Sequence, residues 1–267
     1  MSKESHARGA ESRGCMKTKS LILIAASAAM ICICSGQTVK AGSPPTLSSS
    51  SPGTATVRGA VKFEGKMAKP TPINMAADPS CAKQHPTPVL SQDVVADPKG
   101  GLQNVIVFIA DGLGDRTFDA PNQPAVIEQK GCTYQPHVLA LRANQLLEVV
   151  NHDPTTHNIH PTPANNREWN KAELPGTKVD EAFAREEIAI PVKCNIHPWM
   201  RSYVAVFKHP YFVVTGKDGS FDLSSLPPGT YTVEAWHEKL GAATQKITVG
   251  ADETKTVDFI FKPRPGT

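Results

Sequence analysis

Short runs of apolar or alternating residues recur from residue 55 to the end of the chain. A period of two and many β-branched side chains are typical of strands. Turn signals such as Asp218-Gly219 and Pro175-Gly176 separate the runs, and long amphipathic helix patterns are missing. We therefore predict an all-β chain with strands at 56–63, 104–110, 137–143, 146–151, 187–193, 203–207, 211–215, 230–236, 245–249 and 256–261.

The first 54 residues differ from this pattern. Lys17 and Lys19 precede "LILIAASAAMICIC", an apolar run that is typical of a secretory signal and short for a membrane span. We expect a signal peptide over residues 1–41, with Met16 as a possible true start, and a Ser/Pro linker at 42–54. The mature chain is then expected to be exported to the periplasm, soluble or tethered, without a transmembrane helix.

Charge is nearly balanced once this leader is set aside. The chain has 28 Lys and Arg against 25 Asp and Glu, and the leader holds six basic and two acidic residues, which leaves 22 and 23. A near-neutral mature chain gives no indication of nucleic-acid binding. Its length of about 226 residues is enough for two β-sandwich units.

Three cysteines lie beyond the leader, namely Cys81, Cys132 and Cys194. An odd number in an oxidising compartment leaves one without a disulfide partner. A bond between Cys81 and Cys132 would close a loop of roughly 50 residues, which is worth about 4 kcal/mol in the chain-entropy model. We expect Cys194 to be the unpaired thiol; the alternative is that it pairs with one of the other two.

The stretch "VKCNIHPWM" (192–200) places a thiol, an imidazole and a thioether three residues apart, in Cys194, His197 and Met200. His157 in "THNIHP" is the best candidate for a fourth ligand. Two imidazoles, a thiolate and a weak thioether suit copper that cycles between two oxidation states. Zinc is the rival, because Cys and His also bind it, although Met is a poor zinc ligand.

Residues 122–207 resemble the type 1 (blue) copper cupredoxins of the amicyanin and plastocyanin kind. "CNIHPWM" is similar to the family's loop of Cys, two residues, His, Pro, an aromatic and Met, and "HNIH" is similar to its upstream His-Asn segment. The resemblance implies a Greek-key sandwich that holds one type 1 copper ion. Its ligands would be His157, Cys194, His197 and Met200, with Asn158 joining the two ligand loops by hydrogen bonds.

The same resemblance implies reversible one-electron transfer rather than enzymatic turnover. The partners would be periplasmic redox proteins that dock weakly and transiently over the His197 edge, with an interface under about 1,200 Å². His160 is expected to point away from the site, because residues three apart on a strand face opposite sides. The polar segment 161–186, with Trp169, does not map onto the family pattern.

A second resemblance covers the flanking sequence. Residues 211–236, "YFVVTGKDGSFDLSSLPPGTYTVEAW", are similar to carboxypeptidase regulatory-like domains, which have a carbohydrate-binding-like sandwich fold, and their usual V-x-G-x-V opening occurs at Val57. We predict a sandwich split between 55–115 and 208–264, with the cupredoxin unit (122–207) inserted. The alternative is that residues 55–121 add strands to the cupredoxin unit.

A function of another class remains open at this point. The chain would then be an exported binding or adhesion module, for example one that binds carbohydrate, and its metal would be structural zinc or stored copper. Copper loading discriminates the electron-transfer function from the binding module, because only a copper–thiolate site gives an intense visible band.

Overall fold

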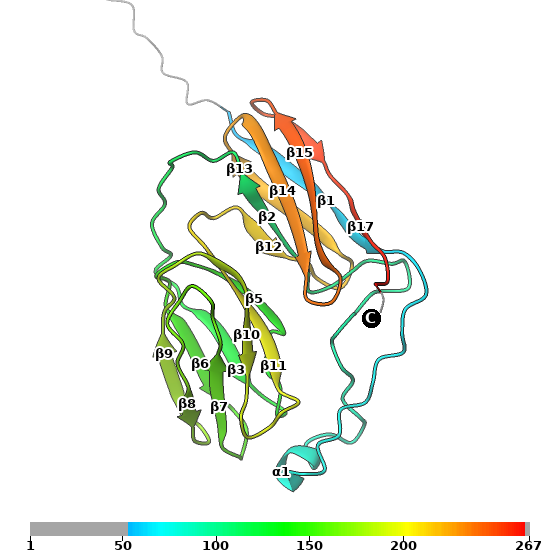
Figure 1. The fold of residues 1–267 in the computed structure, drawn as a ribbon, viewed down its shortest axis with the longest axis vertical. Helices are drawn as coiled ribbons and strands as arrows, with labels where there is room; N and C mark the ends of the chain where they lie inside the picture. The colour runs from blue at the N-terminus through cyan, green and yellow to red at the C-terminus, as the bar shows by residue number, and fades with distance from the viewer. Residues whose placement is uncertain (1–52, 265–267) are drawn as a thin grey trace, which may run out of the picture. The chain divides into compact units, whose positions relative to one another are not determined.

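The structure of the chain is a computed structural model that describes residues 53–264. The expected leader (1–41) and nearly all of the linker (42–54) lie outside the described residues. Within that part the chain is almost entirely β, with one short helix among its strands (Figure 1), so the all-β prediction is confirmed. Between residues 53 and 264, no helix is long and apolar enough to cross a membrane.

Strands from both ends of the described chain form one sandwich, which we call the split sandwich. One sheet has the order β13-β1-β16, with β17 also paired to β1, and the other has the order β12-β2-β14-β15. The bounds are β1 Ala55–Phe63, β2 Ile106–Asp111, β12 Phe212–Val214, β13 Ser220–Leu226, β14 Gly229–His237, β15 Gly241–Val249, β16 Thr254–Thr256 and β17 Phe259–Phe261. β1 pairs antiparallel with β13 and parallel with β16 and β17.

The core of the split sandwich follows from alternation along its strands. In β14, Tyr231, Val233 and Ala235 are buried while their neighbours are partly exposed, so one face of the strand turns inward. Gly219 closes the turn before β13 with φ of +71°, and a Cβ there would lie 2.3 Å from the carbonyl oxygen of Val61. Only glycine fits that turn without displacing β1.

The middle of the chain forms a second sandwich, which we call the inner sandwich. Its sheets have the orders β5-β11-β10-β7-β8 and β4-β3-β6-β9. The bounds are β3 Ala125–Gln129, β4 Tyr134–Gln135, β5 Val138–Arg142, β6 Leu147–Asn151, β7 His157–Pro161, β8 Lys171–Glu173, β9 Lys178–Glu181, β10 Glu187–Lys193 and β11 Arg201–Phe207. β3 and β6 run parallel, as do β5 and β11, and the other pairs are antiparallel.

The polar segment 161–186 is an integral part of the inner sandwich. β8 pairs with β7, and β9 pairs with β6, so the segment adds one strand to each sheet. Trp169 and Phe183 pack into the core, where their side chains are 8% and 1% exposed. The segment therefore stabilises the sandwich through two buried aromatics in spite of its polar composition.

The connection between β1 and β2 contains the one helix of the described chain, α1 (Pro79–Ala82). Asp78 caps it, because its carboxylate accepts the backbone N–H of Ser80, and proline stands at the first helical position.

Cys81 forms the predicted disulfide with Cys132. Cys81 and Met75 are buried in the core of the inner sandwich, although we had grouped residues 55–115 with the split sandwich. The covalent bond to Cys132 explains why this part of the connection packs there.

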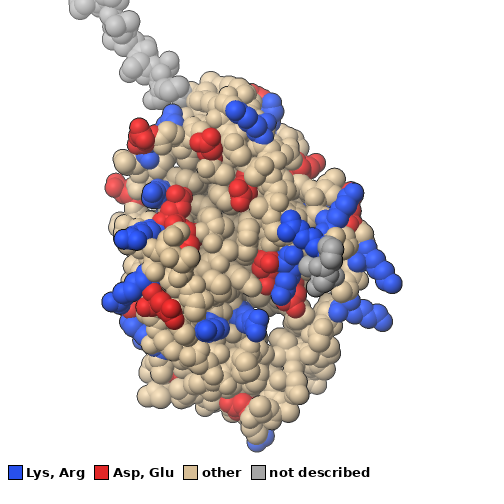
Figure 2. Space-filling model, in the orientation of Figure 1, with Lys and Arg blue, Asp and Glu red and all other residues tan. Residues whose placement is uncertain are grey.

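Charged side chains of both signs are interspersed over the face that Figure 2 presents. Ion pairs near the surface of the described chain include Lys239 with Asp93 and Lys178 with Glu148. Pairs of this kind contribute about 0–1 kcal/mol each, so the packing of the two cores dominates stability.

Candidate metal centre

Two neighbouring strands bring the candidate ligands together. His157 begins β7, and Cys194 directly follows the end of β10; these strands are antiparallel neighbours, with Lys193 opposite His160. The loop after β10 is closed by two backbone hydrogen bonds, from the N–H of Met200 to the oxygen of His197 (2.9 Å) and from the N–H of Cys194 to the oxygen of Met200 (3.3 Å). This tight loop turns His197 back toward Cys194.

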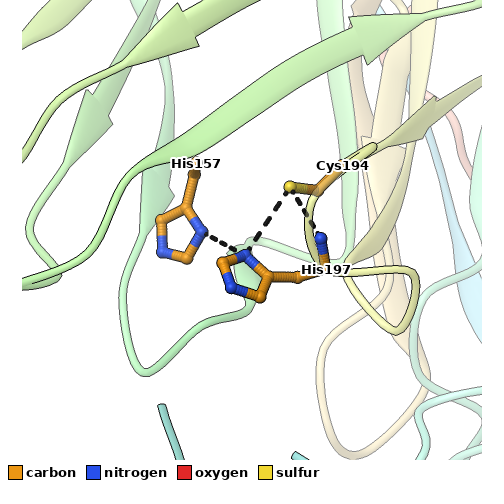
Figure 3. Close-up of side chains that lie close together, drawn as sticks. All are labelled: His157, Cys194 and His197. Carbon is orange, nitrogen blue, oxygen red and sulfur yellow. Dashed lines mark hydrogen bonds between the residues drawn. The ribbon is translucent and has the colours of Figure 1, made fainter. Parts of the chain in front are cut away.

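The side chains of His157, Cys194 and His197 converge in a buried space (Figure 3). The two Nδ1 atoms are 2.9 Å apart, and the Sγ of Cys194 lies 3.8 Å from Nδ1 of His197. One ligand atom from each residue lies within 4.8 Å of the others, and no side chain of the three is more than 3% exposed. Among the described residues, Cys194 is the free cysteine.

This donor set fits a single copper or zinc ion. Bonds of about 2.0–2.3 Å to one ion would place ligand atoms roughly 3.4–3.7 Å apart. The distance from Sγ of Cys194 to Nδ1 of His197 is about 0.1 Å above this range, and the two imidazoles need to separate by about half an ångström. Met200 is 1% exposed in the same core cluster as Cys194, so a soft thioether is held in this region of the core.

Asn158 connects the β7 ligand to the loop that carries the other two. Its Oδ1 accepts hydrogen bonds from the backbone N–H of Asn195 (2.7 Å) and from the thiol of Cys194 (3.3 Å). Its backbone oxygen accepts a bond from the buried hydroxyl of Tyr134 (2.5 Å). The thiol also lies 3.3 Å from the backbone N–H of His197. The N–H of His197 and the contact with Asn158 together fix the orientation of the sulfur.

The electrostatics of the metal-free centre favour a thiolate. Burial alone would raise the pKa of Cys194, but hydrogen bonds from His157 and from backbone N–H groups lower it to about 6. Burial alone would lower the pKa of His157, but the carboxylate of Asp153 and the sulfur of Cys194 raise it to about 9. At neutral pH the centre therefore holds a thiolate beside an imidazolium, so metal binding need not remove a proton from sulfur.

Three carboxylates near the candidate ligands, those of Asp153, Asp78 and Glu173, were not predicted from the sequence. Asp153 is 2% exposed and lies 2.8 Å from Nε2 of His157; Asp78 lies 2.9 Å from Nε2 of His197. Glu173, fully buried and paired with His157 across β7 and β8, has its pKa raised to about 7, mainly by burial. Sequence offered one signal, because Asp followed by Pro at 78–79 is typical of a helix start.

Docking over an exposed His197 edge does not agree with the structure. The His197 side chain is 2% exposed, because Asp78 and Cys81, at the start of α1, lie against its Nε2. The disulfide to Cys132 holds this segment in place. His160, which we expected to point away from the site, lies outside the cluster and forms hydrogen bonds with Asn195 and Glu168.

Comparisons with known proteins give one family model and several solved structures. Residues 202–262 match the family model of the carboxypeptidase regulatory-like domain, a match that begins within β11 of the inner sandwich. A search of curated proteins finds no match. Solved structures that the chain is similar to include cupredoxins and a copper enzyme.

One is a copper-containing nitrite reductase from Thermus scotoductus, 18% identical over 36% of this chain, with a TM-score of 0.31. The alignment spans only 25% of that enzyme. Another is a purple cupredoxin from Nitrosopumilus maritimus, 22% identical over 31% of this chain and 99% of its own, with a TM-score of 0.28. A third is an amicyanin mutant, 17% identical over 38% of this chain and 98% of its own, with a TM-score of 0.30.

Proposed function

We propose that this chain is an exported blue copper protein that transfers single electrons between periplasmic redox partners. The observation that carries the proposal is the convergence of two imidazoles and one free thiol in a buried space, where one ligand atom of each lies within 4.8 Å of the others. In this proposal His157, Cys194, His197 and Met200 hold one type 1 copper ion. Bound there, copper supplies a reversible couple between Cu(II) and Cu(I).

The chain's own residues account for the rest of the proposed mechanism. Asn158 and the loop's backbone hold the sulfur of Cys194 and the loop that carries His197 close to the arrangement that metal binding needs. A rigid donor set keeps the site's geometry similar in both oxidation states, so little rearrangement accompanies each electron. Substrate turnover is no part of this function, and the nitrite reductase activity belongs to the enzyme of that name.

Partners in this proposal are redox proteins that bind weakly and transiently. Because His197 is buried, contact through its imidazole edge would require the α1 segment to move. A partner could instead contact exposed side chains of the ligand loop. One of these is the large apolar side chain of Ile196, which is 51% exposed. Small, transient interfaces suit fast exchange of electrons.

A second function has one observation in its favour. Structural zinc sites are closed to solvent, and the centre formed by His157, Cys194 and His197 is closed as well. The chain would then be an exported binding module, in which the metal stabilises the inner sandwich or copper is stored.

Copper loading of the purified chain tests these functions. We expect an intense thiolate-to-Cu(II) visible band in the wild type that Cys194→Ser abolishes, and full bleaching and recovery through cycles of reduction and oxidation. The control is His152→Asn, because His152 is an exposed histidine that pairs with Glu128. A colourless protein that keeps zinc against a copper excess would refute the redox function.

A further inference from the structure

Each candidate ligand imidazole has a carboxylate at its outer nitrogen. Nε2 of His157 lies 2.8 Å from Oδ2 of Asp153, and Nε2 of His197 lies 2.9 Å from Oδ2 of Asp78. An ionised carboxylate only accepts hydrogen bonds, so both imidazoles donate their Nε2–H outward. Each Nδ1 then faces the inside, where the two atoms lie 2.9 Å apart and share a proton, and a metal that replaces this proton can bind both lone pairs.

Both carboxylates are themselves held in position. Asp153 accepts the backbone N–H groups of Gly131 (2.6 Å) and Cys132 (2.8 Å). Asp78 accepts the N–H (2.8 Å) and hydroxyl (2.6 Å) of Ser80 at one oxygen. Each carboxylate is thus surrounded by N–H and O–H donors, and it acts as a hydrogen-bond acceptor toward the imidazole beside it.

The disulfide joins the two supports. Cys81 lies in α1, three residues after Asp78, and Cys132 contributes one of the N–H groups that hold Asp153. One covalent bond therefore fixes the distance between the two carboxylates across the centre. Asp78 comes from the connection between β1 and β2, 119 residues before His197, so a segment outside both sheets of the inner sandwich completes the centre.

We propose that Asp78 is a positioning residue for the metal ligand His197, as Asp153 is for His157, and that the pair of carboxylates biases the centre toward Cu(II). This inference rests on the proposed function. The carboxylates select the tautomer that leaves Nδ1 free and prevent either ring from rotating away. Their negative charges stabilise the divalent ion more than the monovalent one, so they lower the reduction potential.

Asp78→Asn is the main test, because asparagine keeps both the size of the side chain and the capacity to cap α1. We expect the affinity for Cu(II), measured against a competing chelator, to fall about 10- to 100-fold. The reduction potential, measured by spectroelectrochemistry, should rise, and the visible band should persist. The matched control is Asp222→Asn, which removes the same charge from an exposed position on β13.

A second measurement starts from the wild-type protein and observes the hydrogen bond of His197 directly. In zinc-loaded protein, which is diamagnetic, the Nε2–H of His197 should give a slowly exchanging proton resonance in the NMR spectrum, shifted by its bond to Asp78. Loss of this protection in Asp78→Asn supports the inference. A wild-type spectrum in which the Nε2–H exchanges as fast as that of exposed His152 would overturn it.

The two proposals fail in different ways. If the wild type forms the copper–thiolate band but Asp78→Asn matches Asp222→Asn in affinity and potential, the positioning role is wrong and the redox function stands. If the wild type forms no such band, the redox function fails, and the zinc-loaded spectrum alone decides whether Asp78 holds His197.

Discussion

Removal of the disulfide should destabilise the inner sandwich strongly. Cys81 and Cys132 are both fully buried and are 51 residues apart in the sequence. The chain-entropy model gives a cost of about 4 kcal/mol for a loop of this length. We therefore expect Cys81→Ala/Cys132→Ala to lose about 4 kcal/mol in the free energy of unfolding, a large share of the 5–15 kcal/mol of a typical domain.

Urea denaturation followed by tryptophan fluorescence measures this loss. Trp169 and Trp199 pack in the inner sandwich, whereas Trp236 belongs to β14 of the split sandwich. A Trp236→Phe background therefore restricts the signal to the inner sandwich. With a slope of about 1–2 kcal/mol per molar urea, the midpoint should fall by roughly 2–4 M.

Reduction of the wild-type disulfide provides the control, since it cuts the same crosslink without a change of sequence. Metal-free protein should be used, so that binding to the centre adds no stability. Agreement between the reduced wild type and the double alanine variant would attribute the loss to the crosslink. A midpoint shift below about 0.5 M in both would show that the α1 segment contributes little to the inner sandwich.

Two further predictions concern Asn158 and His237. Asn158→Ala should cost about 1–3 kcal/mol in metal-free protein, because it removes hydrogen bonds to the thiol and to Asn195; a urea curve identical to that of the wild type would contradict this. Burial lowers the pKa of His237 to about 4, and its Nδ1 accepts two backbone N–H groups. The unfolded state protonates near pH 6.5, so His237 by itself should lower the free energy of unfolding by about 2 kcal/mol between pH 7 and 5. His237→Gln should make the fall shallower, and an unchanged slope in urea titrations at the two pH values would contradict the reasoning.

Strands with clear alternation were predictable from sequence. β10 has the expected bounds, 187–193, and β14 extends the expected 230–236 by one residue at each end. β8 and β9, "KAE" and "KVDE", were missed because their residues are mostly polar. Their strand character comes from pairing with β7 and β6. Tertiary pairing of this kind is outside what a local pattern can indicate.

The candidate metal centre also has a part that the sequence could predict and a part that it could not. Cys194, His197 and Met200 lie in one short loop, so their spacing alone indicated that they belong together. Asp78 is brought to His197 from a distant segment by a disulfide, and a helix-start signal does not say what the helix will contact. The burial of His197 follows from that long-range contact and could not be predicted from the loop.

The position of β1 also affects the order in which the chain acquires its structure during synthesis. β1 is made early, yet its partners β13, β16 and β17 begin at residue 220, about 160 residues later. All strands of the inner sandwich have been made by residue 207. At about 5–20 residues per second, the first strand stays without its neighbours for on the order of ten seconds or more. Because the inner sandwich is inserted between β1 and its partners, the unpaired edge of β1 must be kept from pairing with other chains during this time.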